Sequence, residues 1–352
     1  MYKLFTKVHF HLEILEEIRY NHNCKNQMQG EIIMKKIISV ILAVMLVLSL
    51  AACGASGASK MTMGTGGTAG TYYAYGGVLG QYIKNHADID VVVVSTDGSK
   101  ANIQSIDAGD YQLGTVQSDV LAYAWAGTRS FEEEGAIDSF RVVAGLYAEA
   151  VQLITMDPEI KSVADLKGKS VSIGAPGSGV YFNAVDVLGA AGLTEADINA
   201  QYQSFADSTD ALKDGKIDAA FIVAGAPTPA ITELCTTNDA YLVPIDGAIA
   251  DSLIASCPFY TAYSIPAGTY PGQDADVTTV TVKATLIVSA DADEDDVYNL
   301  TKAIFDNVDA IAAENAKGNE LSIENAVSGM EAPFHAGAAK YFAEQGATVA
   351  TE

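Results

Sequence analysis

Short apolar runs that alternate with helical stretches constrain the fold of this chain more than any other feature. A β-branched strand over 89–95 precedes a helix near 101–108, and a strand over 111–116 precedes a helix over 119–126. Strands separated by helices in this way are typical of βαβ units, in which neighbouring strands run parallel. We therefore predict an α/β fold built on a parallel sheet.

The same alternation continues on both sides of this segment. Further strands are predicted at 61–63, 140–147, 151–156, 170–173, 219–223 and 279–288, and further helices at 71–85, 180–190 and 207–213. Another helix is predicted to begin at the Pro227 and Pro229 pair, and one more follows the apolar stripe over 297–311. The strand 279–288 is predicted to return to the first unit. The chain would then form lobe 1 from 61–156 and 266–352 and lobe 2 from 157–265, joined by a hinge of two crossovers.

Glycine-rich or polar segments follow four of the predicted strands. These segments are Gly64–Tyr73, Ser95–Asn102, Gln117–Asp119 and Gly174–Val180. Glycine lets the backbone approach a ligand, and a helix N-terminus offers free N–H groups to an anion. Each segment taken singly is also explained as a turn or a helix cap. Together they lie at the carboxyl ends of strands, where α/β proteins bind ligands, so we predict a binding site there.

No catalytic or cofactor motif accompanies these segments. Gly64, Gly66 and Ala69 match a dinucleotide-binding pattern, but no acidic residue follows about 20 residues later to hold a ribose. The chain has no Gly-x-Ser-x-Gly elbow. Asp119 could act as a general base, but beside Gln117 and Ser118 it is as readily a ligand acceptor. We predict that the protein is not an enzyme and carries no cofactor.

The segment from Met34 to Cys53 has the order of an export signal. Lys35 and Lys36 precede an apolar run over 37–50, which is shorter than the roughly 20 residues that span a bilayer. Leu50-Ala51-Ala52-Cys53 resembles the lipobox of bacterial lipoproteins, which implies cleavage before Cys53 and its lipidation. An ordinary signal with a chance cysteine is the alternative. We therefore predict a signal peptide over 34–52, a tether over 53–60 and an extracytoplasmic, membrane-anchored protein.

Residues 1–33 fit neither a signal nor a folded element. Gln29-Gly30-Glu31 can be encoded by a purine-rich sequence of the ribosome-binding kind, a few bases before the codon of Met34. We expect translation to start at Met34, leaving residues 1–33 as an upstream segment that is not made. The nucleotide sequence of the gene tests this expectation.

Charge and cysteine content narrow the class of partner. The first 52 residues hold six of the 20 basic and four of the 44 acidic side chains, so the remaining 300 residues carry 14 and 40, a net charge of about −26. So acidic a chain is not suited to nucleic acid, whose phosphates require Lys and Arg. Cys235 and Cys257 could form a disulfide outside the cytoplasm or remain two buried thiols. No His/Cys cluster has the spacing of a metal site.

Seven segments in the same order resemble the TAXI family of solute-binding proteins, which serve TRAP (tripartite ATP-independent) transporters. The matching stretches are Gly64–Tyr73, Ser95–Ile103, Gly114–Gly127, Glu149–Leu153, Gly168–Gly179, Gly225–Ile231 and Pro333–Phe342. The resemblance implies a two-lobed, type II periplasmic-binding-protein fold that closes on its ligand. It also implies delivery of a small carboxylate or amino acid, glutamate- or glutamine-like, to a TRAP permease. Ala69 and Ala74 depart from the family pattern.

The resemblance also implies which residues line the cleft. They are Gly66, Gly67, Thr68, Tyr72, Ser99, Asn102, Gln117, Ser118, Gly177, Ser178 and Gly179, to which the residue pattern adds Thr71 and Asp119. Lys100 is the one basic residue in the four glycine-rich or polar segments that follow the strands, which favours a zwitterion with its carboxylate on the glycine-rich loop and its ammonium on Asp119 or Asp97. A ligand-sensing lipoprotein and an exported α/β enzyme are the alternative functions.

Overall fold

Ten strands form one mixed sheet in the computed structural model, which describes residues 58–352. The strands are β1 (Ser59–Gly64), β2 (Ile89–Val94), β3 (Leu113–Gln117), β4 (Phe140–Thr155), β5 (Ser170–Ser172), β6 (Asn199–Gln201), β7 (Ala219–Ala224), β8 (Tyr241–Val243), β9 (Thr261–Ile265) and β10 (Val277–Ser289). Their order is β2-β1-β3-β10-β4-β7-β5-β6, with β8 paired to β4 and β9 paired to β10. Strands β1, β2 and β3 are mutually parallel, as are β5, β6 and β7, so the predicted βαβ units are present.

The predictions for the N-terminal segment lie outside the described residues. These are the upstream segment 1–33, the signal peptide 34–52, lipidation of Cys53 and the tether as far as residue 57. The predicted C-terminal end of the tether is wrong. Ser59 and Lys60 already belong to β1, because they pair in parallel with Ile89 and Asp90 of β2. Among residues 58–352, no helix combines the length and the apolar character needed to cross a bilayer.

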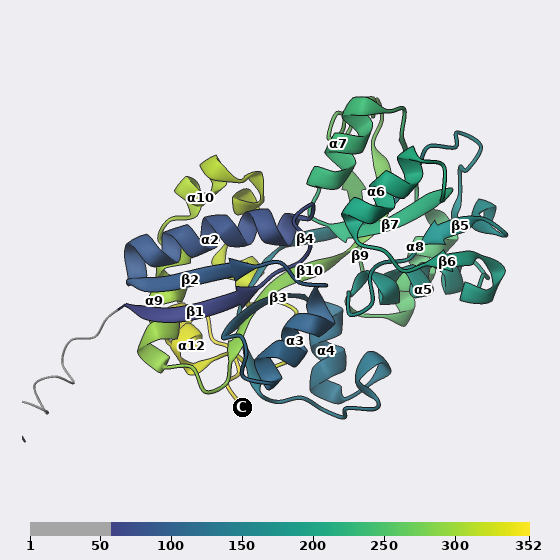
Figure 1. The fold of residues 1–352 in the computed structure, drawn as a ribbon. Coiled ribbons are helices and arrows are strands. Elements are labelled where there is room, and N and C mark those ends of the chain that lie inside the picture. Colours follow the sequence, from purple (N-terminus) through teal and green to yellow (C-terminus); the bar gives the residue numbers. More distant parts are fainter. Residues whose placement is uncertain (1–57) are drawn as a thin grey trace, which may run out of the picture. The chain divides into compact units, whose positions relative to one another are not determined.

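Two long strands, β4 and β10, connect the group of elements around β1, β2 and β3 with the group around β5, β6 and β7 (Figure 1). We predicted two strands where β4 is a single strand of 16 residues. It stays unbroken because its first half pairs with β10 and its second half with β7 and β8. Both long strands run antiparallel to their neighbours, so the sheet is mixed and the expectation of a wholly parallel sheet is wrong.

Helices cover the sheet. The α-helices are α2 (Thr71–Ala87), α3 (Ser99–Asp107), α4 (Ser118–Ala126), α5 (Val180–Ala190), α6 (Phe205–Lys213), α7 (Pro229–Thr237), α8 (Gly247–Ser256), α9 (Glu294–Phe305), α10 (Val308–Glu314), α11 (Ile323–Val327) and α12 (Ala336–Glu344). Short 3₁₀ turns are η1 (Arg129–Phe131), η2 (Val163–Leu166), η3 (Glu195–Asp197) and η4 (Ala316–Glu320). The single helix predicted over 297–311 is divided into α9 and α10. It divides because Asn307 leaves the helical conformation and its side-chain Nδ2 donates to the carbonyl of Ala303, 2.8 Å away, ending α9.

Buried apolar side chains form three clusters. The first draws on residues 61–147 and 284–342, whereas the other two draw on residues 150–282. The second and third clusters lie on opposite faces of β7, since Phe221 and Val223 belong to one and Ala220 and Ile222 to the other. The lobe boundaries at 156/157 and 265/266 remain a prediction.

The two cysteines of this region lie on opposite sides of the sheet. Cys257 packs against the second cluster and Cys235 against the third, and both are free thiols. A disulfide requires Cα atoms within about 7 Å, which an intervening sheet prevents. The pairing of Cys235 with Cys257 is therefore not formed, and the alternative of two separate thiols is the one observed.

Candidate ligand-binding site

Three helix N-termini meet at one cavity. Helix α2 begins after Gly70, α3 after Gly98 and α5 after Gly179, and all three of these glycines line the same cavity of about 70 Å³. None of the three helices has a side-chain cap at its N-terminus. In α3 the N–H groups of Lys100 and Ala101 donate to the backbone carbonyl of Gly177. The positive ends of the three helix dipoles, with the N–H groups that the helices leave free, favour a negatively charged ligand in this cavity.

Eight of the thirteen predicted contact residues line this cavity. They are Gly66, Gly67, Thr71, Tyr72, Ser99, Gln117, Ser178 and Gly179. They come from the ends of β1 and β3 and from the starts of α2, α3 and α5, so the strand ends converge as the pattern suggested. Within the described part of the chain, no Lys or Arg lines the cavity.

The other predicted residues lie elsewhere. Thr68 lines a separate surface groove beside Phe205, and Gly177 lines another beside Lys100. Ser118 belongs to the wall of a different hollow, and its Oγ accepts a hydrogen bond from the backbone N–H of Lys283 at 3.1 Å. Thr68, Gly177 and Ser118 are therefore not part of the cavity surface.

Asn102 is a structural residue and not part of the cavity wall. Its side chain is fully buried, and its Nδ2 donates to the backbone carbonyls of Thr65 at 2.7 Å and Thr115 at 2.8 Å. Its Oδ1 accepts from the hydroxyl of Thr96 at 2.7 Å. The amide thus joins the ends of β1 and β3, and both of its polar ends are already engaged.

Asp119 lies behind the cavity, fully buried in the first turn of α4. Its Oδ2 accepts a hydrogen bond from Nδ2 of Asn183 at 2.9 Å, and Oδ1 of Asn183 accepts from Nε2 of Gln117 at 2.5 Å. Burial raises the pKa of Asp119 to about 6, against the lowering effect of the Asn183 hydrogen bond. Asp119 supports Gln117 through Asn183 and does not itself line the cavity.

Glu149 lines the cavity and was missed by the sequence analysis. It lies on β4 with only 1% of its surface exposed, and the hydroxyl of Tyr72 donates to its Oε2 at 2.5 Å. Burial raises the pKa of Glu149 well above its ordinary value, although the hydrogen bond from Tyr72 lowers it. The available signal was a carboxylate within an otherwise apolar run, in one of the stretches that carry the family resemblance.

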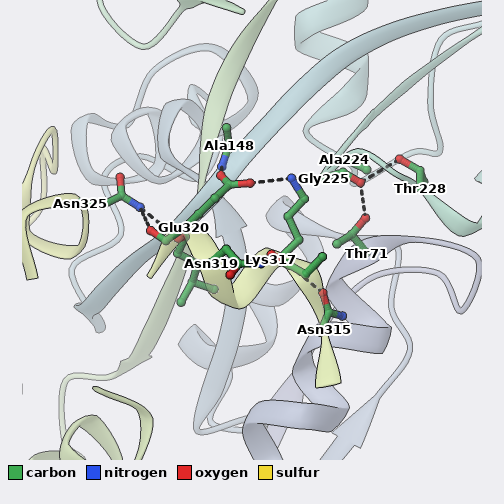
Figure 2. Close-up of polar contacts among 12 residues, drawn as sticks. Thr71, Ala148, Ala224, Gly225, Thr228, Asn315, Lys317, Asn319, Glu320 and Asn325 are labelled. Carbon is green, nitrogen blue, oxygen red and sulfur yellow. Dashed lines mark hydrogen bonds and ion pairs between the residues drawn. The ribbon is translucent and has the colours of Figure 1, made fainter. Parts of the chain in front are cut away.

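Lys317, the buried cation beside Glu149, forms an ion pair with Glu320. Nζ of Lys317 lies 2.6 Å from Oε1 of Glu320, and Oε2 of Glu320 accepts from the backbone N–H of Ala148 at 2.7 Å (Figure 2). Ala148 precedes Glu149 in β4, so this ion pair flanks the cavity wall. Among residues 58–352, no Lys, Arg or His forms an ion pair with Glu149.

Several contacts close the cavity from both sides. The hydroxyl of Thr71 donates to the carbonyl of Gly225 at 2.7 Å (Figure 2), and the N–H of Ala230 donates to the carbonyl of Ala69 at 3.1 Å. Arg129 in η1 and Asp186 in α5, which do not line the cavity, form an ion pair with an N–O distance of 2.8 Å. The cavity is thus enclosed by residues far apart in the sequence.

Metal ligation is not suggested by this geometry. In the part of the chain that the structure describes, no three His, Cys, Asp or Glu side chains are grouped to hold a metal ion. His335 caps α12 and lies beside the carbonyl of Ala292, and His86 lies at the end of α2. The cavity lining therefore offers backbone N–H groups, hydroxyls, amides, Asp97 and Glu149.

A protein-family comparison agrees with this architecture. A model described as the NMT1-like family matches residues 63–346, which is most of the chain. The chain belongs to the NMT1-like family. Its matched region begins within β1 and ends after α12, so it includes every element that contributes to the cavity.

This NMT1-like protein was compared with solved structures, of which PhnD1 supports the shared fold. PhnD1 from Prochlorococcus marinus (MIT 9301), in complex with methylphosphonate, is 12% identical over 74% of this chain and 90% of that chain, with a TM-score of 0.50. The alkanesulfonate-binding protein SsuA from Xanthomonas axonopodis pv. citri, bound to MOPS, is 16% identical over 83% and 92%, with a TM-score of 0.47. A putative L-cystine ABC transporter protein from Listeria monocytogenes is 16% identical over 75% and 98%, with a TM-score of 0.47. The predicted periplasmic-binding-protein fold is confirmed, and at these identities the likeness extends to the fold alone.

Proposed function

We propose that this NMT1-like protein is an extracytoplasmic solute-binding lipoprotein that captures a small carboxylate or amino acid and delivers it to a TRAP-type permease. The observation that carries the proposal is the convergence of three helix N-termini, none with a side-chain cap, on a cavity that no Lys or Arg lines. Such a site holds an anionic group with N–H groups and helix dipoles. A ligand with a single carboxylate fits better than a multiple anion, because the chain from Cys53 carries a net charge of about −26.

Family and fold support a binding role. The NMT1-like match covers residues 63–346, and PhnD1, which has the same fold, was solved in complex with methylphosphonate. The ordered motifs that resemble the TAXI family are the reason to propose a TRAP permease as partner and a glutamate- or glutamine-like ligand. The lipobox-like Leu50-Ala51-Ala52-Cys53 is the reason to propose a lipid anchor at Cys53.

An exported enzyme is the less favoured function. General acid–base catalysis is most often performed by histidine, and neither His86 nor His335 lies in the cavity lining of the described residues. The second alternative, a ligand-sensing lipoprotein, shares the same cavity and differs only in its partner. A permease gene beside this one would favour transport, and a lone sensor-kinase gene would favour signalling.

Isothermal titration calorimetry on the purified protein tests the ligand class. The panel is glutamate, glutamine, 2-oxoglutarate, glutarate, methylphosphonate and an alkanesulfonate. We expect saturable binding of at least one carboxylate and a matching rise in the melting temperature, since a ligand bound only to the native state stabilises it. Tight binding of the phosphonate or sulfonate with no response to any carboxylate would overturn the proposed ligand class.

A further inference from the structure

The cavity has an electrostatic asymmetry that its helix N-termini do not account for. The starts of α2, α3 and α5 favour negative charge. The carboxyl group of Glu149 nevertheless lies in the same lining. A carboxylate in the cavity wall would repel an anionic ligand, so a site that binds only an anion does not explain the presence of Glu149.

The surroundings of Glu149 lack a positive partner. Its Oε2 accepts one hydrogen bond, from Tyr72, and within residues 58–352 its Oε1 accepts none. The charge of the flanking Lys317 lowers the pKa of Glu149, but Lys317 forms its ion pair with Glu320. The charge of Asp119 raises the pKa of Glu149 and so opposes the effect of Lys317. A buried carboxylate of this kind is stable when ionised only if a cation reaches it.

Glu149 and the starts of α2, α3 and α5 line one small cavity. A ligand that places a carboxylate on the N–H groups can therefore place a cation at Glu149 only if the two groups are close together. An α-amino acid carries its ammonium and carboxylate on the same carbon atom. The other acidic group in the lining, Asp97, is exposed and keeps its hydration without a ligand.

We propose that Glu149, oriented by the hydroxyl of Tyr72, receives the ammonium group of the ligand and selects α-amino acids over carboxylates that lack the amino group. This inference rests on the proposed function, because it assumes that a carboxylate binds at the helix N-termini. It corrects the sequence-based choice of Asp119, which lies behind the cavity, and it favours Glu149 over Asp97.

Proton release follows from this assignment. In the empty cavity the protonated form of Glu149 is favoured, because burial raises its pKa well above the ordinary value. When an ammonium group arrives, the O–H bond of Glu149 breaks, its proton passes to the buffer, and the carboxylate pairs with the ammonium. A carboxylate without the amino group leaves that proton in place.

Calorimetry with matched ligands tests the proposal. Glutamate is compared with glutarate, and glutamine with 4-carbamoylbutanoate, because each pair differs only in the amino group. For the wild-type protein we expect the amino acid to bind at least 100-fold more tightly than its matched analogue. Titration in two buffers of different ionisation enthalpy is expected to report proton release when the amino acid binds and none when its analogue binds.

Substitutions then assign the effect to a residue. Glu149→Gln is expected to weaken amino-acid binding at least 100-fold, to change binding of the matched analogues less than threefold, and to abolish proton release. Tyr72→Phe is expected to produce a smaller loss with the same ligand dependence. Asp97→Asn tests the other acidic residue of the lining, and it is expected to keep the preference for the amino acid over its analogue whatever its effect on the affinity for both.

Three results would overturn the assignment. They are equal affinity of the wild-type protein for amino acid and analogue, an equal loss for both ligands in Glu149→Gln, and a selective loss in Asp97→Asn instead. If Glu149→Gln does not fold, the wild-type selectivity and proton release still decide the question. Failure of the wild-type protein to bind any carboxylate would overturn the proposed function, whereas carboxylate binding without amino-group selectivity would overturn only the role of Glu149.

Discussion

The backbone carbonyl of Gly177 accepts a hydrogen bond from the backbone N–H of Lys100 at 3.0 Å, and a second from that of Ala101 at 3.2 Å. The loop that precedes α5 thereby caps the N-terminus of α3, which has no side-chain cap of its own. This contact joins two of the three helix starts at the cavity. Gly177 therefore closes the site with its backbone, where a direct ligand contact was predicted.

Substitution of Gly177 is expected to weaken ligand binding by disturbing this closure. Gly177 has φ +83°, a conformation that costs a residue with a Cβ roughly 1–2 kcal/mol. Gly177→Ala should lower affinity by about tenfold in calorimetry. Gly109→Ala, at φ +80° in a turn away from the cavity, is the control. It should lower the free energy of unfolding similarly without changing affinity, and equal affinity losses in both variants would contradict the closing role.

Gly179 is expected to tolerate no side chain. A Cβ at this position would overlap Oε1 of Gln117 and lie 2.9 Å from Cγ2 of Val120. Gly179→Ala should therefore lower the free energy of unfolding by roughly 1–3 kcal/mol and displace Gln117 from the cavity wall. Urea unfolding and calorimetry measure the two effects.

Gly189, in the same helix, supplies a matched control for Gly179. A Cβ there would meet nothing within 4 Å. Because glycine is about 1 kcal/mol less favourable than alanine inside a helix, Gly189→Ala should be neutral or stabilising. A comparable loss of stability in both variants would show that the Gln117 contact is not the cause.

The Arg129–Asp186 ion pair, which joins η1 to α5, is expected to contribute modestly to the free energy of unfolding. The guanidinium donates to both carboxylate oxygens, at 2.8 and 3.2 Å, and lies 5.0 Å from the ring centre of Tyr123. Both partners are partly exposed, so a double-mutant cycle of Arg129→Ala and Asp186→Ala should give a coupling free energy of about 1 kcal/mol. The coupling should decrease at high salt. Additive effects of the two single substitutions would show that the ion pair does not stabilise the protein.

Asp119 is expected to make the native state less stable as pH rises from about 4 to 6. Burial raises its pKa from 3.8 to about 6, so in this window the unfolded chain releases a proton that the native chain keeps. Asp119→Asn cannot ionise and keeps an oxygen to accept from Asn183. Its stability relative to wild type should increase through this window, by on the order of 3 kcal/mol in total.

Urea unfolding at several pH values between 4 and 7 measures the Asp119 effect. The informative quantity is the difference between Asp119→Asn and wild type, because other carboxylates titrate in both proteins. The exposed Asp110→Asn serves as the control and should show no such pH dependence. A difference for Asp119→Asn that does not vary with pH would contradict a buried, raised-pKa carboxyl at this position.

Much of the fold follows from local sequence patterns. The strand that ends at Gly64 and the helix that begins at Thr71 are visible because side-chain periodicity and glycine-rich turns are properties of neighbouring residues. The same holds for Pro229, which opens α7 as the Pro-rich start predicted. Strand β4 was divided wrongly, since only pairing with β10, β7 and β8 makes it continuous.

The sequence by itself determined the α/β architecture and the strand ends at which the cavity forms, because both depend on short-range patterns. Only the tertiary structure decided which polar side chains face that cavity. The side-chain amide of Asn102 donates hydrogen bonds to the backbone carbonyls of Thr65 and Thr115. The carboxylate of Glu149 accepts a hydrogen bond from Tyr72, a residue 77 positions away. The burial and hydrogen-bond partners of a polar group are set by segments distant in sequence, so no local pattern could separate the structural amide from the cavity carboxylate.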